Sequence, residues 1–131
     1  MTSHTQRTLA ALRKSGLVPA VVERWNPHAP RPGGGRGIRQ DLFGCIDILA
    51  LDPAGGPILA VQSTGQDYAG HMRKLLGERR AMVRLWLLSG NALELWAWRK
   101  VKVKRGGKAK RWAPRIRVLS LSDVEGGDIY L

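Results

Sequence analysis

Leu42-Phe-Gly-Cys-Ile-Asp-Ile-Leu-Ala-Leu51 is a nearly continuous apolar run, which is typical of a buried strand. A second apolar run, Ile58-Leu-Ala-Val-Gln-Ser-Thr64, follows after the turn Asp52-Pro-Ala-Gly-Gly-Pro57. A short turn rich in glycine and proline favours antiparallel pairing of the strands on either side of it. The two runs therefore predict a buried hairpin centred near Gly55.

Each strand of this predicted hairpin carries polar residues within its apolar pattern. Asp47 lies in the middle of the first run, and Gln62 and Thr64 end the second. Pairing across the turn brings Asp47 roughly opposite Gln62 or Ser63. An ionised carboxylate at a buried position is costly unless it is paired, hydrogen-bonded or bound to a metal. The pattern predicts a polar site beside the sheet.

The rest of the chain predicts one domain with alternating helices and strands. Its 131 residues suit one domain with its own core. We expect helices over 5–14 and 68 to about 80, strands over 17–25, 82–88, 92–104 and 112–121, and a flexible basic loop over 28–37. This order predicts an α/β or α+β sandwich.

The net charge of +12 comes from 22 Lys+Arg against 10 Asp+Glu and indicates a polyanionic partner. A membrane surface is disfavoured because no segment forms a basic amphipathic helix with a broad apolar face. The alternative, an arginine-rich composition without function, fits less well because the charge is clustered. The polar N-terminus lacks the apolar stretch of a signal peptide, and the single Cys45 is expected to be buried and inert, so we expect a cytoplasmic protein.

The order of elements and the Gly44-Cys-Ile-Asp47 motif resemble the PD-(D/E)XK nuclease superfamily, which includes restriction endonucleases and Holliday-junction resolvases. The resemblance implies an α/β restriction-endonuclease-like fold, a mixed sheet flanked by helices with an αβββαβ core. We place that core at about 5–88 of a single domain, 1–131, with a basic β-hairpin extension at about 92–121. Gln62-Ser-Thr64 stands where the family has its acidic-x-Lys motif.

The resemblance implies a site for Mg²⁺, or Mn²⁺, with Asp47 as the main ligand. Gln62 would add an uncharged oxygen, and Glu23 or Asp41 would complete the shell. Thr64 cannot replace the family's lysine, so Lys74 or Arg73 on the following helix is the candidate cation for the phosphate. The alternative is that Asp47 is a structural carboxylate satisfied by arginine or backbone partners.

The hairpin between Arg99 and Arg117 holds ten lysine and arginine residues and no acid. A basic β-ribbon of this kind can lie along a nucleic-acid groove and neutralise several phosphates. The expected nucleic-acid contacts are Arg36, Arg39, Arg73, Lys100, Lys102, Lys104, Arg105, Lys108, Lys110, Arg111, Arg115 and Arg117. Trp96, Trp98 and Trp112 either stack on unpaired bases or pack the sheet.

These features together predict a metal-dependent DNA endonuclease, encoded by a phage or mobile element and acting on duplex or branched DNA. Symmetric cutting of two strands would suit a homodimer. One alternative is an inactive nucleic-acid-binding module on the same scaffold, which the altered motif at Gln62 and Thr64 favours. Another is an RNA-binding protein. His4, His28 and His71 show no metal-ligand spacing with Cys45.

Overall fold

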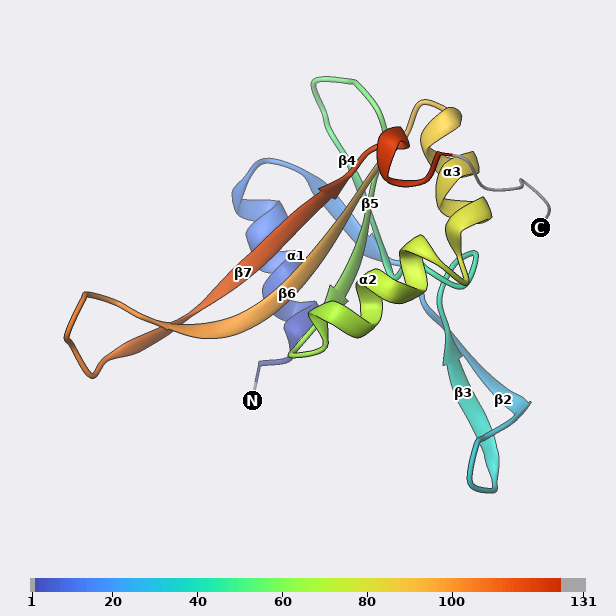
Figure 1. Cartoon of the computed structure of the whole chain (residues 1–131), viewed down its shortest axis with the longest axis horizontal. Helices are drawn as coiled ribbons and strands as arrows, with labels where there is room; N and C mark the ends of the chain where they lie inside the picture. The colour runs from blue at the N-terminus through green and yellow to red at the C-terminus, as the bar shows by residue number, and fades with distance from the viewer. Residues whose placement is uncertain (1, 126–131) are drawn as a thin grey trace.

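The computed structural model describes residues 2–125 of the predicted 1–131 domain, and the remaining positions lie outside the described range. It contains a five-stranded mixed sheet flanked by helices, together with a separate two-stranded sheet (Figure 1). The elements are α1 (His4–Lys14), β1 (Val18–Val21), β2 (Arg24–Pro30), β3 (Arg36–Gln40), β4 (Ile48–Leu51), β5 (Leu59–Thr64), α2 (Tyr68–Leu76), α3 (Arg80–Leu88), β6 (Ala92–Lys102), β7 (Lys110–Leu119) and a short 3-10 turn, Leu121–Asp123.

The main sheet has the strand order β1-β4-β5-β6-β7. β4 and β5 pair antiparallel with Ile48 opposite Val61, so the predicted hairpin is confirmed. β5 and β6 run parallel, with Gln62 beside Leu95. A parallel pair needs a long crossover, and α2 and α3 supply it. β2 and β3, which follow β1 and precede β4 in the chain, form the separate sheet. This sheet projects from the body of the molecule (Figure 1).

Two apolar clusters hold the layers together, one on each face of the sheet. The cluster under α2 and α3 includes Leu75, Val83 and Leu93, all fully buried. The cluster under α1 includes Leu12, Trp96 and Trp98. Successive side chains of a strand point to opposite faces, and β6 accordingly gives its leucines to one cluster and its tryptophans to the other. Cys45 is buried as expected, and burial raises the pKa of its thiol to about 11.

The predicted strand over 82–88 is wrong, because these residues belong to helix α3. Met82, Val83, Trp86 and Leu87 lie at helical spacing and pack on the cluster beneath α2 and α3. A short apolar run of this length fits either a strand or one face of a helix. The strand that follows the helices is therefore β6. The predicted core ended at about residue 88, but β6 starts after that residue and is part of the main sheet.

Three further boundaries differ from the prediction. The single strand over 17–25 is two strands in different sheets, because the chain leaves the sheet edge at Val22 and Glu23. The predicted loop over 28–37 is largely the β2–β3 hairpin, in which Arg31 donates to the Arg36 and Gly37 carbonyls. The first buried run becomes a strand only at Ile48, since Leu42 and Ile46 close a tight turn.

Candidate functional site

Asp47 directly precedes β4, and the residue is 5% exposed. The backbone N–H of Ser63 donates to both of its carboxylate oxygens, at 3.1 and 3.2 Å. The amide nitrogen of Gln62 lies 3.4 Å from Asp47 Oδ2. Asp47 thus faces Gln62 and Ser63 across the hairpin, and this part of the sequence prediction is confirmed.

Glu23 and Asp41 join Asp47 in one carboxylate cluster. The Val22 N–H donates to the Asp47 carbonyl at 3.0 Å, which fixes the end of β1 beside Asp47 and places Glu23 next to it. Asp41 directly follows β3. One oxygen of each carboxylate lies within 4.8 Å of an oxygen of each of the others, a spacing at which the cluster could hold a metal ion. The structure therefore brings together both acids between which the sequence could not decide.

Two basic residues contact the outer members of this cluster. Arg39 donates to Glu23 at 2.9 Å, and Lys74 Nζ lies 4.0 Å from Asp41 Oδ2. Asp47 forms no salt bridge within the described part of the chain. The pKa of Asp47 is raised to about 7, mainly by burial and in part by the charges of Asp41 and Glu23, while the hydrogen bond from the Ser63 N–H opposes the rise. Among the described residues, Asp47 is therefore the one carboxylate of the cluster without a basic partner.

Gln62 gives independent support for a cation at this place. Its Nε2 donates to Asp41 at 3.1 Å and to Asp47, whereas its buried Oε1 has no hydrogen-bond partner among the described residues. Buried polar atoms are rarely left unpaired. Rotation of the amide would turn Oε1 toward the carboxylates and give an oxygen-only donor set, which suits a hard divalent cation. Glu23, Asp41, Asp47 and Gln62 thus fit such an ion by chemistry and by spacing.

A cleft of about 480 Å³ opens beside Asp41 and is lined by Lys74, Arg39 and Arg79. Lys74, one of the two candidates for a cation at the phosphate, borders both the cleft and the cluster. Arg73, the other candidate, is exposed and does not line the cleft. Arg79 was not predicted: its buried Nε has no hydrogen-bond partner in the described chain. Gly77, which ends α2, is the feature of the sequence that could have indicated a turn before Arg79.

His4 also lies at this site without having been predicted. Its Nδ1 is 3.1 Å from the hydroxyl oxygen of Ser63, whose N–H holds Asp47. Ser63 also bonds Thr8, which accepts from Trp98, so the same contacts tie α1 to β5 and β6. Burial lowers the pKa of His4. The spacing between the histidines could not predict this position, because His4 reaches Ser63 only through the packing of α1 on the sheet.

The predicted nucleic-acid contacts are all exposed. Arg36 and Arg39 lie on β3, Arg73 on α2, Lys100 and Lys102 on β6, Lys104, Arg105 and Lys108 in the turn, and Lys110, Arg111, Arg115 and Arg117 on β7. Trp96 and Trp98 are buried under α1, so they pack the sheet. Trp112 is 39% exposed and belongs to neither cluster.

Comparison with protein-family models, with curated proteins and with solved structures found no match to this chain. Within residues 2–125, no helix has the length and apolar character needed to cross a membrane.

Proposed function

We propose that this chain is a metal-dependent DNA endonuclease with the PD-(D/E)XK, restriction-endonuclease-like fold. The observation that carries the proposal is the convergence of Glu23, Asp41 and Asp47 beside Gln62, whose Oε1 has no hydrogen-bond partner among the described residues. The chain order supports it as well, because α1, β1, β4, β5, the helices and β6 follow the αβββαβ order with β2–β3 inserted. β6 takes the place of the fourth core strand.

In this proposal the three carboxylates and Gln62 Oε1 hold Mg²⁺ or Mn²⁺, which when bound activates water and polarises the scissile phosphate. Lys74 stabilises the negative charge that develops on the phosphate oxygens. Arg79 supplies a second cation from the wall of the same cleft. The oxygen of water joins phosphorus, the bond from phosphorus to the sugar oxygen breaks, and that oxygen takes up a proton.

The cations of β6–β7 and β3 hold the DNA in this proposal. The two hairpins project from different sides of the body, and α2 lies between them (Figure 1). Their exposed lysines and arginines can neutralise phosphates on both sides of the carboxylate cluster. Symmetric cutting of two strands would suit a homodimer, which sedimentation of the protein with and without DNA would detect.

The test is incubation of supercoiled plasmid and of a four-way DNA junction with the protein in Mg²⁺, Mn²⁺ or EDTA. We expect cutting with the metals, none with EDTA, and none by the Asp47→Ala variant. Asp52→Ala is the matched control, since Asp52 is exposed and lies in the β4–β5 turn. Metal-dependent cutting that survives in Asp47→Ala would refute the assignment of the site.

A second candidate, a binding module without catalysis, is favoured by Gln62 and Thr64. Gln62 contributes no charge, and in the structure its Nε2 lies on the Asp41 and Asp47 side of the amide. Tight DNA binding without cutting by the wild-type protein in either metal would support this candidate. If Asp47→Ala unfolds, the isosteric Asp47→Asn variant separates loss of metal binding from loss of the fold, with circular dichroism as the check.

A further inference from the structure

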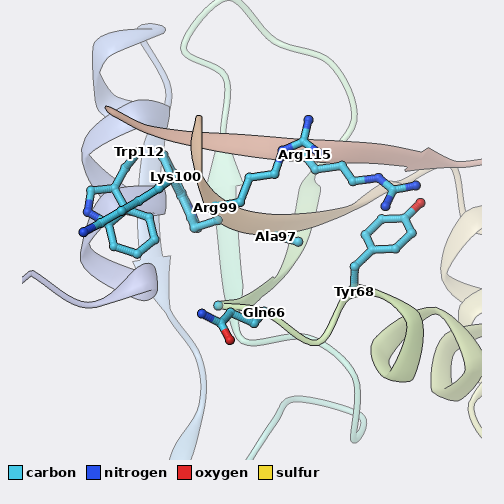
Figure 2. A pocket seen from close by; sticks show the side chains of 9 residues that line it. Gln66, Tyr68, Ala97, Arg99, Lys100, Trp112 and Arg115 are labelled. Atoms are coloured by element: carbon cyan, nitrogen blue, oxygen red, sulfur yellow. The ribbon is translucent and has the colours of Figure 1, made fainter. Parts of the chain in front are cut away.

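A second hollow of about 570 Å³ lies where β5 ends and the β6–β7 hairpin leaves the body. We call it the aromatic groove; it is lined by the side chains of Gln66, Tyr68, Arg99, Lys100, Trp112 and Arg115. Figure 2 shows Trp112 and Tyr68 on opposite sides of the groove, with Gln66 between them below the strands. Its volume lies in the range of small-molecule sites, roughly 300–1,000 Å³.

The two rings of the aromatic groove are held by cations. The Arg115 guanidinium lies 3.6 Å from the centre of the Tyr68 ring, and that of Arg7 lies 4.1 Å from the Trp112 ring. Lys100 Nζ lies 5.3 Å from the same Trp112 ring. Trp112 nevertheless remains 39% exposed, so these contacts orient the ring and leave part of it open to solvent. An oriented, exposed indole is a surface on which a flat ring can stack.

The charge of the aromatic groove selects an anionic ligand. Arg99, Lys100 and Arg115 line it, and its described lining contains no carboxylate. Gln66 is exposed and offers both a donor and an acceptor, which is what the edge of a nucleobase requires. A flat ring joined to a phosphate satisfies the stacking surface, the cations and the amide together.

We propose that the aromatic groove binds an unpaired nucleotide of a DNA strand, with its base stacked on Trp112 and its phosphates contacting Arg99, Lys100 and Arg115. This deepens the proposed function and rests on it for the choice of DNA. In a duplex the faces of the bases are covered by their neighbours, so the groove requires a single-stranded segment. The preferred substrate would then carry unpaired nucleotides, as a flap or an open junction does.

The groove and the carboxylate cluster are linked through β5. Gln62 faces the cluster, and Gly65, three residues further along the chain, lines the groove. Three extended residues span about 10 Å, so the two places are close along the backbone of β5. In this proposal the unpaired segment of the DNA is bound near the phosphate that is to be cut.

The experiment measures binding in EDTA of a labelled thymidine dodecamer and of an abasic strand with the same number of phosphates. Wild-type protein is expected to bind the thymidine strand about tenfold more tightly than the abasic one. Trp112→Ala should remove that difference, and Trp112→Phe should restore most of it. Ile116→Ala, an exposed position on the same strand, is the control and should behave as wild type. These substitutions are neutral, so they leave the charge of the groove unchanged.

Equal affinity of the wild-type protein for both strands would overturn the inference, and so would an equal loss of affinity for both in Trp112→Ala. Displacement of the thymidine strand by dTMP at concentrations near those of the strand would also overturn it, because the groove would then serve a free nucleotide. Because binding is measured without metal, a protein that cuts no DNA can still pass this test. A protein that cuts DNA can likewise fail it.

Discussion

The carboxylate cluster takes its residues from the ends of β1 and β3, the start of β4 and the middle of β5, whereas the basic surface of β6–β7 comes from one continuous stretch. Glu23, Asp47 and Gln62 are far apart in the chain, and Asp47 lies beside both of the others only because β1, β4 and β5 pair side by side. The lysines and arginines of the hairpin are neighbours in sequence and remain neighbours in space. The cluster therefore depends on tertiary structure, and the hairpin surface depends on local structure alone.

The two regions also differ in what their charges cost the fold. The acids of the cluster are largely buried: the side chains of Glu23 and Asp41 are 21% and 16% exposed, and Asp47 is 5% exposed. The cations of the hairpin are exposed, so water and counterions screen them. Without a bound cation, the cluster destabilises the protein by like-charge repulsion and desolvation, while the hairpin does not. Each prediction below tests one side of this difference.

The largest effect is expected from Asp47→Asn in metal-free buffer. The pKa of Asp47 in the folded protein, about 7, lies above its ordinary value of 3.8, so the folded state holds the proton more tightly. The stability contributed by the neutral acid is complete below that ordinary value and is lost as the pH rises through about 7. The free energy of unfolding should fall by at most about 4 kcal/mol over this range in the wild type, and this fall should be absent in the variant.

Denaturant unfolding in EDTA at several pH values between about 4 and 8 measures this difference. Desolvation also lowers the pKa of His4 and of His71, which makes stability rise with pH in both proteins, so the comparison between them cancels that contribution. If the free energy of unfolding varies with pH in the same way in the wild type and the variant, ionisation of Asp47 does not destabilise the folded protein. The cluster would then need no cation to stabilise it.

A smaller effect is expected from removing two charges of the hairpin. Lys102→Gln with Lys104→Gln should lower the slope of log K against log salt for duplex binding by about 2, since each phosphate contact contributes about 0.9. Arg13→Gln with Lys14→Gln, which removes two equally exposed charges at the end of α1, should leave the slope nearly unchanged. Equal slopes for the two double variants would show that net charge alone, not the hairpin, attracts the DNA.

The sequence predicted the hairpin surface more fully than the site, for a physical reason. A run of lysines with a glycine turn can be recognised as a basic hairpin from the sequence, because both the charge and the turn depend on residues that are adjacent in the chain. Asp47 opposite Gln62 was also predictable, because a short turn fixes the register. The choice between Glu23 and Asp41 was not, since it depends on where β1 leaves the sheet and on the inserted β2–β3 hairpin, and both of these follow from packing.

Arg79 and His4 escaped prediction for the same reason. Arg79 reaches the cleft because α2 ends before Gly77, whereas the helix expected to continue to about residue 80 included Arg79. His4 reaches Ser63 only when α1 packs on the sheet. Apolar periodicity identifies which face of an element is buried, but it does not identify which polar residues at the ends of different elements meet.

The smallest effect is expected from alanine substitution of two glycines, one of which lies in the wall of the cleft beside the carboxylates. Gly44 (φ +74) and Gly55 (φ +93) both adopt the left-handed conformation, which costs other residues about 1–2 kcal/mol. A Cβ at Gly55 would meet open space, whereas at Gly44 it would lie 2.7 Å from the guanidinium carbon of Arg79. Gly44→Ala should therefore destabilise the protein more than Gly55→Ala, by roughly 1 kcal/mol, unless Arg79 swings away.

Binding of a DNA duplex separates these outcomes: a displaced Arg79 would weaken binding in Gly44→Ala while the stabilities of the two variants remain equal. Equal stability together with unchanged binding would mean that Arg79 is not part of the phosphate contact, leaving Lys74 and Arg39 as the cations that line the cleft beside the carboxylates.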